Sequence, residues 1–293
     1  MTKPINRAIE LLAQDQPIYY MGGHTGHTLT YEQGLLDAGT WADYINVGME
    51  HGAFNMAGLD AYMQGLVAGG PTRSGHRTPT VIVEAPVEGI SAEMVNYNAW
   101  QFRQILARGV HGILLCQAET AAAVAAFVAA CRYPINRIGV GAGLSEGRRG
   151  IGSEPSAAPV WGVDRDIYLH LADVWALNPQ GQLLLGVKIE SVAAIEHIEA
   201  ILGVPGIGFA EMGPGDLSLS LGYRRPPDPL PAEMEAVRQR VQAACRANGL
   251  AFLESATPSD VCAKIDAGAR IIAGQREETA RQGRKHTGRT MPV

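Results

Sequence analysis

The sequence predicts an α/β protein folded as a single (β/α)8 TIM barrel over residues 1–293, with a long loop after the fourth βα unit and an extended C-terminal helix. Eight short runs, nearly all apolar and rich in β-branched residues, recur along the chain, as expected of parallel strands buried on both faces. Helix-length patterns separate most of these runs, which indicates parallel βαβ units. A doubly wound open sheet is the alternative, but eight strands would make it long.

The expected strands can be placed one by one along the chain. They are residues 17–22, 44–49, 80–85, 112–117, 183–190, 206–213, 250–255 and 269–274. Several of the helix patterns between them end at Gly or Pro, which are the usual helix stop signals. Residues 1–16 have the pattern of an amphipathic N-terminal helix and not that of a signal peptide.

One connection is longer than the others. Residues 134–164 carry many Gly, Pro and Arg residues, and we expect a loop there, followed by a helix over residues 165–179. Loops of this length in compact domains are usually functional or disordered. The tail, from about residue 276 to 293, begins as a helix and ends as a charged segment.

The bulk composition excludes several kinds of partner. Hydrophobic residues make up 46% of the chain and charged residues 18%, which is ordinary for a globular protein with a sizeable core. The net charge of −5 gives no attraction to nucleic acid or to an anionic membrane, and no apolar run is long enough to span a bilayer. The four cysteines are scattered without a paired motif, so we expect small core residues in a reduced, cytoplasmic compartment.

Polar residues stand where several expected strands end. In a barrel of this kind the chemistry lies at the carboxyl ends of the strands, and carboxylates there are costly to bury unless they are paired or bind metal. The residues at these ends are Glu50, His51, Glu84, Glu190, Glu211, Asp216, Glu254 and Ser255.

Glu190 and Asp216 end adjacent strands and can therefore converge on one point. Two carboxylates without cysteine make an oxygen-rich site that favours Mg²⁺ or Mn²⁺. The turn from Gly213 to Gly215 opens a helix whose first amides can bind an acid group, so we expect Asp216 to hold a metal and this turn to hold a carboxylate. The structural alternatives stay open: an N-capping role for Asp216 and an ordinary ion pair for Glu190.

At these residues the sequence resembles the HpcH/HpaI aldolase family, the metal-dependent class II pyruvate aldolases. The resemblance is carried by "VKIESVAAIEHIEAILGVPGIGFAEMGPGDLSLSLGY", residues 187–223. Further matches lie at residues 44–66, 109–124 and 131–134, and the resemblance covers roughly residues 5 to 275. It implies a TIM barrel, a homo-oligomer (a hexamer, or trimer of dimers, with exchanged C-terminal helices) and an enolate mechanism on a 2-oxo acid and an aldehyde.

The resemblance also implies roles for single residues. Glu190 and Asp216 would bind the divalent metal, with Mg²⁺ or Mn²⁺ favoured and Co²⁺ or Zn²⁺ possible. The amides of Gly215 and Asp216 would hold the substrate carboxylate, and His51 would help to move protons.

Three positions depart from the family pattern. Glu84 stands where the family has an arginine, and Gly48 and Ala107 stand where it has aspartates. Removing a cation from a place where negative charge develops during the reaction often costs several kcal/mol of transition-state stabilisation. We therefore consider Glu84 as an acid or base and Arg148 as a substrate-binding replacement for the arginine, against the plainer interpretation of Arg148 as a solvated residue.

Two other features offer further acid–base groups. His24 or His27 could replace the lost partners of His51, although a polar loop is the simpler interpretation. Glu84 and Glu254 could form an acid–base pair.

These observations favour a metal-dependent carbon–carbon lyase, an aldolase that acts through a 2-oxo acid enolate. The alternatives are the same metal site redirected to decarboxylation, hydrolysis or isomerisation, and a barrel that binds a ligand without turnover. Retention of both Glu190 and Asp216 disfavours the last, because a binder without chemistry has little need of a metal site.

Overall fold

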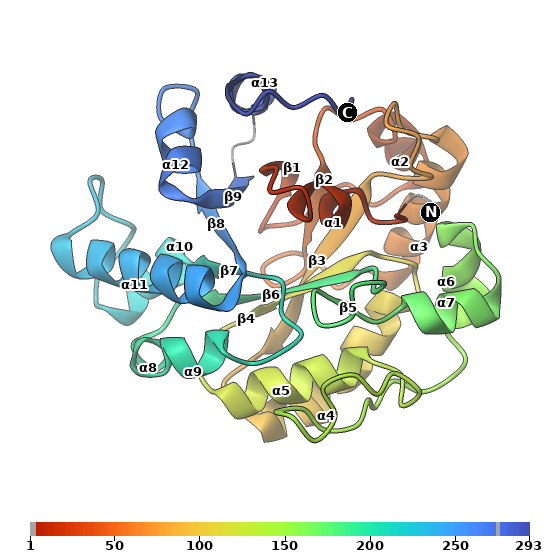
Figure 1. Cartoon of the computed structure of the whole chain (residues 1–293), viewed down its shortest axis with the longest axis horizontal. Coiled ribbons are helices and arrows are strands. Elements are labelled where there is room, and N and C mark those ends of the chain that lie inside the picture. Colours follow the sequence, from red (N-terminus) through yellow and green to blue (C-terminus); the bar gives the residue numbers. More distant parts are fainter. Residues whose placement is uncertain (1–3, 274–275) are drawn as a thin grey trace.

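A computed structural model describes residues 4–273 and 276–293 and shows a closed barrel of eight parallel strands with helices around it (Figure 1). Each strand pairs with its neighbours in the ring, and β1–β9 and β4–β6 pairings complete the closure. The barrel strands are β1 (Ile18–Gly23), β2 (Tyr44–Gly48), β3 (Thr80–Glu88), β4 (Gly112–Cys116), β6 (Leu183–Ile189), β7 (Phe209–Met212), β8 (Ala251–Ser255) and β9 (Ala269–Ala273). The predicted TIM-barrel fold is confirmed. Residues 1–3 of the expected N-terminal helix and residue 274 of the expected last strand lie outside the described residues.

The helices begin where the sequence supplies caps. Side chains of Asn6, Thr30, Asn55, Ser91, Thr120 and Ser191 each accept a hydrogen bond from a first-turn amide of the helix that follows. The helices are α1 (Arg7–Leu12), α2 (Tyr31–Asp37), α3 (Met56–Gly69), α4 (Ala92–Leu106), α5 (Ala121–Cys131), α6 (Glu154–Trp161), α7 (Arg165–Leu171), α8 (Val192–Glu196), α9 (Ile198–Leu202), α10 (Pro214–Ser220), α11 (Ala232–Asn248), α12 (Val261–Ala267) and α13 (Glu277–His286). Within the described ranges, no helix has the length and apolar character needed to cross a membrane.

The connection between β4 and β6 differs from the sequence expectation. Its expected loop contains α6, because Pro155 in the first turn favours a helix start and its missing N–H costs nothing there. The expected helix over residues 165–179 ends at Leu171, and the next residues form a short strand, β5 (Val174–Trp175), beside β6. The buried carboxylate of Asp173, held by Arg132 at 2.5 Å, draws the chain inward at this point. The N-terminal helix α1 is also shorter than residues 1–16.

The barrel interior is apolar at the bottom and polar at the mouth. An apolar layer, closed from below by α1, includes Tyr44, Ile82, Leu114, Leu184 and Phe209. Side chains two residues further along a strand point the same way, one layer higher. That upper layer contains Asn46, Glu84, Cys116 and Glu211, together with Lys188, which is in register with Glu211, and all of them are buried. The buried polar groups of the barrel are therefore gathered at the carboxyl ends of the strands.

Candidate active site at the mouth of the barrel

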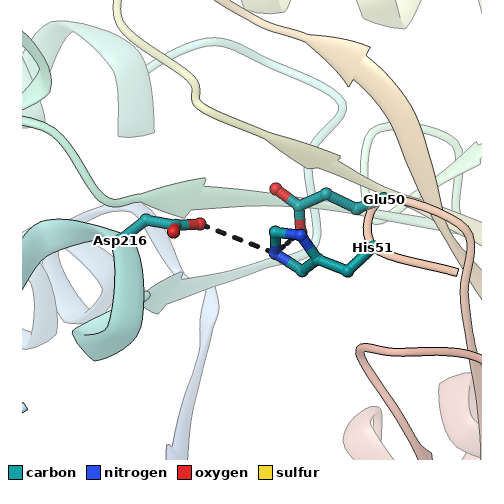
Figure 2. Close-up of side chains that lie close together, drawn as sticks. All are labelled: Glu50, His51 and Asp216. Atoms are coloured by element: carbon teal, nitrogen blue, oxygen red, sulfur yellow. Dashed lines mark ion pairs between the residues drawn. The ribbon is translucent and has the colours of Figure 1, made fainter. Parts of the chain in front are cut away.

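Glu50 lies at the centre of the polar mouth. It belongs to two groups of potential metal ligands, one with His51 and Asp216 and one with Cys116 and Glu190, and in each group the ligand atoms lie within 4.8 Å of one another. In Figure 2 Asp216 extends from α10 toward His51 and Glu50, which follow β2. His51 Nε2 is 3.6 Å from Glu50 Oε2 and 3.8 Å from Asp216 Oδ2. The two ligands expected from the sequence, Glu190 and Asp216, thus each lie in a group with Glu50, but not in the same group.

The Gly-Pro-Gly turn is shaped around Glu190. The Gln117 amide donates to Glu190 Oε1 at 2.7 Å. A Cβ at Gly213 would collide with Oε2 of the same carboxylate, so a side chain at that position would displace Glu190. A Cβ at Gly215 would meet nothing within 4 Å, and the space beside the first turn of α10 is therefore open.

Lys188 supplies a positive charge to the mouth. Its Nζ lies 2.7 Å from Glu50 Oε2 and 3.6 Å from Glu84 Oε2, and its side chain is only 5% exposed. Burial alone would lower the pKa of Lys188, but the Cys116 sulfur and the carboxylates around it raise that pKa above its usual value. Lys188 is therefore a charged ammonium held between two buried carboxylates.

Glu84 is ionised and held by neutral and cationic groups. Asn46 Nδ2 donates to Glu84 Oε1 at 2.8 Å, and His24 Nδ1 lies 2.7 Å from the same oxygen. Burial would raise the pKa of Glu84, but the contacts with His24 and Lys188 outweigh it and lower that pKa. The close contact with Glu84 raises the pKa of His24 in turn.

Two other buried carboxyl groups bind protons unusually tightly. Burial raises the pKa of Glu190 to about 8 and that of Glu211 to about 7, and in both cases the charge of Lys188 offsets part of the effect. Glu211 Oε2 has no hydrogen-bond partner among the described residues. Burial therefore favours the neutral forms of Glu190 and Glu211, and a cation bound beside them would favour their ionised forms.

Several residues considered from the sequence lie elsewhere. His24 contacts Glu84, and His27 contacts Asp37 at 2.8 Å and the Tyr62 hydroxyl. The alternative that one of them partners His51 is therefore not supported, and the acidic groups near His51 are Glu50 and Asp216.

Arg148 and Glu254 also have other partners. Arg148 Nη1 donates to Asn96 Oδ1 of α4 at 2.5 Å, on the outside of the barrel. Glu254 is paired with Arg238 of α11 at 3.3 Å, beside a pocket of about 800 Å³ that borders the mouth. The cation that faces Glu84 is Lys188.

Lys188 and Cys116 were not assigned to the site from the sequence, and Glu50 was noted without a role. A signal for Lys188 was present. It stands two residues before Glu190 in an otherwise apolar strand, and the two-residue period of a strand places both side chains on one face.

Comparisons with known proteins agree with this architecture. A family model described as HpcH/HpaI aldolase/citrate lyase matches residues 93–273. A hydroxypyruvate/pyruvate aldolase of Roseobacter denitrificans is 33% identical over 177 residues, covering 59% of this chain and 60% of that protein. A 2-keto-3-deoxy-L-rhamnonate aldolase of Salmonella schwarzengrund is 31% identical over 176 residues, covering 58% of this chain and 55% of that protein. The matched region thus spans less than two thirds of these relatives.

Solved structures show the same fold over nearly the whole chain. A HpcH/HpaI aldolase/citrate lyase family protein from Burkholderia cenocepacia superposes with a TM-score of 0.69 at 22% identity, covering 97% of both chains. A crystal structure of macrophomate synthase gives a TM-score of 0.68 at 20% identity, covering 97% of this chain and 88% of that one.

Proposed function

The chain belongs to the HpcH/HpaI aldolase/citrate lyase family, and from this we propose that it is a divalent-metal-dependent carbon–carbon lyase, an aldolase that acts through the enolate of a 2-oxo acid. The observation that carries the proposal is that Glu50 belongs to two groups of potential metal ligands at the mouth of the barrel, one with Asp216 and one with Glu190. The names of the two relatives, both aldolases, support the same reaction class.

The residues present fit a divalent cation. The group of Glu50, His51 and Asp216 offers two carboxylates and an imidazole, and the group of Glu50, Cys116 and Glu190 offers two carboxylates beside a cysteine sulfur. The carboxylate oxygens are hard donors suited to Mg²⁺ or Mn²⁺. A cation bound there supplies Lewis-acid stabilisation of the negative charge that develops on a 2-oxo acid.

The remaining tasks fall to groups of the chain itself. The amides of Gly215 and Asp216 open α10, where first-turn N–H groups lack helical partners, and they bind the substrate carboxylate. Open space beside Gly215 leaves room for it. His51, 49% exposed and close to Asp216, is placed to move a proton between the substrate and water.

Lys188 takes over the task of the family's arginine. Its ammonium lies 3.6 Å from the carboxylate that stands at the arginine position, so the mouth keeps a cation despite the charge reversal at Glu84. The lowered pKa of Glu84 keeps this residue ionised as the partner of Lys188, which favours the lyase over a reaction that uses Glu84 as a general acid.

The proposal is tested by exchange of the pyruvate C3 protons in D₂O, followed by NMR with Mg²⁺, with Mn²⁺ and after EDTA. We expect exchange that requires metal and is lost in Asp216→Ala. Asp228→Ala, a change in the exposed loop that follows α10, is the matched control and should exchange at the normal rate. Exchange that survives EDTA, or that persists in Asp216→Ala, would exclude the metal mechanism.

A homo-oligomer, in the form of a hexamer or a trimer of dimers, and a cytoplasmic location belong to the same proposal. Light scattering on the purified protein tests the assembly: a mass near that of a single 31.2 kDa chain would contradict it.

A further inference from the structure

A basic pocket lies outside the barrel, away from the mouth. It measures about 520 Å³ and is lined by Arg103, Arg108, Arg148 and Arg149 together with the segment that leads into α6. Arg103 and Arg108 stand at the C-terminal end of α4. Because α4 begins at the carboxyl end of β3 and runs back along the barrel, its C-terminal end lies opposite the mouth. Arg148 and Arg149, from the long connection between α5 and α6, also line the pocket, and the Arg148 guanidinium reaches Asn96 in the first half of α4.

Arg149 is the unusual member of this group. It is one of three buried arginines of the described chain, with 1% of its surface exposed. Arg132 is paired with Asp173 and Arg7 with Asp43, but Arg149 makes no ion pair with any described residue. Its Nε and Nη1 have no hydrogen-bond partner there either. A buried charge without a counter-ion is costly, and natural proteins rarely leave one uncompensated.

The contacts that Arg149 does make are neutral and direct it toward the start of α6. Its Nη2 donates to the Tyr168 hydroxyl at 2.7 Å and to Ser153 Oγ at 3.0 Å, and its guanidinium lies over the Tyr133 ring at 4.5 Å. Ser153 is the N-cap residue of the eight-residue α6, and its side chain does not cap the helix. The positive end of α6 and the guanidinium therefore meet at the wall of the pocket.

The other groups at this pocket leave its positive charge largely unbalanced. Arg103 is exposed and its side chain has no hydrogen bond or ion pair with another described residue, and Arg148 donates to the neutral Asn96. Arg108 forms an ion pair with Asp60, with Nη1 at 3.4 Å from Oδ1, and both side chains are partly exposed. The one acidic residue at the start of α6, Glu154, accepts from the Gly152 amide at 2.8 Å and forms no ion pair with Arg149.

We infer that this pocket binds a small-molecule oxyanion of the phosphate class. Four arginines line the pocket against two nearby carboxylates, Asp60 and Glu154, and this excess of positive charge suits a phosphate group. Arginine is also suited to bidentate contacts with phosphate oxygens. The volume is that of a ligand pocket, and its position separates the bound anion from the mouth of the barrel. The inference does not depend on the proposed lyase activity.

The test is calorimetric titration of the metal-free protein with inorganic phosphate in EDTA, at an ionic strength held constant with chloride. We expect saturable binding of one phosphate. The double variant Arg103→Ala/Arg148→Ala removes two exposed groups and should weaken that binding by about tenfold or more. Arg137→Ala is the matched control: this exposed arginine of the same connection pairs with Glu146, does not line the pocket, and should leave the affinity unchanged.

Several results would overturn the inference. These are the absence of saturable binding, equal binding by the double variant, and loss of binding in Asp216→Ala, which would place the phosphate at the mouth. As a second measurement, phosphate should raise the melting temperature of the normal protein, and Arg149→Met should lose that increase. If Arg149→Met does not fold, the double variant decides the question.

Discussion

Replacing Lys188 with methionine tests the electrostatic arrangement of the mouth. The substitution keeps most of the side-chain volume but removes the ammonium that lies 2.7 Å from Glu50 and 3.6 Å from Glu84. All three side chains are largely or fully buried. Removing one partner of a buried ion pair leaves an uncompensated charge and costs about 3–5 kcal/mol. We therefore expect Lys188→Met to lower the free energy of unfolding by about that amount near neutral pH.

The loss of unfolding free energy in Lys188→Met should depend on pH. Lys188 helps to lower the pKa of Glu84, so its contribution is present above the unfolded-state pKa of a glutamate, about 4.3, and is lost as the pH falls through the folded-state value. The difference between the variant and the normal protein should therefore shrink only as the pH falls below about 4.3.

The assay is urea unfolding of metal-free protein, followed by fluorescence and circular dichroism, whose transitions should coincide. Lys264→Met is the control, because Lys264 is paired with Asp260 at 2.9 Å but both side chains are about a third or more exposed. Such surface pairs contribute about 0–1 kcal/mol. If Lys188→Met lost no more stability than Lys264→Met, the argument that Lys188 is held between buried carboxylates would be wrong.

Three further predictions concern the metal site. Gly213→Ala should displace Glu190 and weaken Mn²⁺ binding, measured by calorimetric titration, by about tenfold or more. Gly215→Ala is the control: it places its methyl group in open space and should leave the Mn²⁺ affinity unchanged. The free energy of unfolding of the metal-free protein should fall as the pH rises from about 4.3 to about 8. Over this range Glu190 and Glu211 hold protons in the folded state that the unfolded chain releases. Urea midpoints that stay flat or rise with pH would contradict this prediction. Asp216→Asn should weaken Mn²⁺ binding by about a hundredfold yet change the stability of the metal-free protein by less than about 0.5 kcal/mol, since its side chain is partly exposed.

Much of the fold could be predicted from the sequence because its signals are local. Each barrel strand overlaps an expected apolar run, since a strand covered on both faces must be apolar almost throughout. α6 was not expected, because proline is common both in loops and in the first turn of a helix, so the prolines of this segment do not distinguish the two. β5 was not expected because it is two residues long and depends on the neighbouring β6.

The candidate site was predictable only in part, because some of its contacts join residues that are far apart in the sequence. Glu190 and Asp216 lie within one long motif and follow the neighbouring strands β6 and β7, so topology alone places both at the mouth. The contact between Lys188 and Glu50 joins residues 138 positions apart across the mouth, and no local pattern reports it. The placement of Arg148 likewise depends on how the long connection packs against α4, which its composition does not determine.

The position of Lys188 changes the meaning of the charge reversal at Glu84. Taken alone, a glutamate in place of an arginine removes a cation from the site and adds a buried anion. In the folded barrel the same layer contains a lysine that reaches this glutamate, so the positive charge has moved from β3 to β6 and the carboxylate acts as its counter-ion. Because Lys188 also contacts Glu50, which links the two groups of potential ligands, the relocated cation is tied directly to the candidate metal site. The charge reversal at Glu84 weakens the case for a lyase, but the ammonium of Lys188 compensates for the lost cation. Glu84 and Lys188 must therefore be considered together.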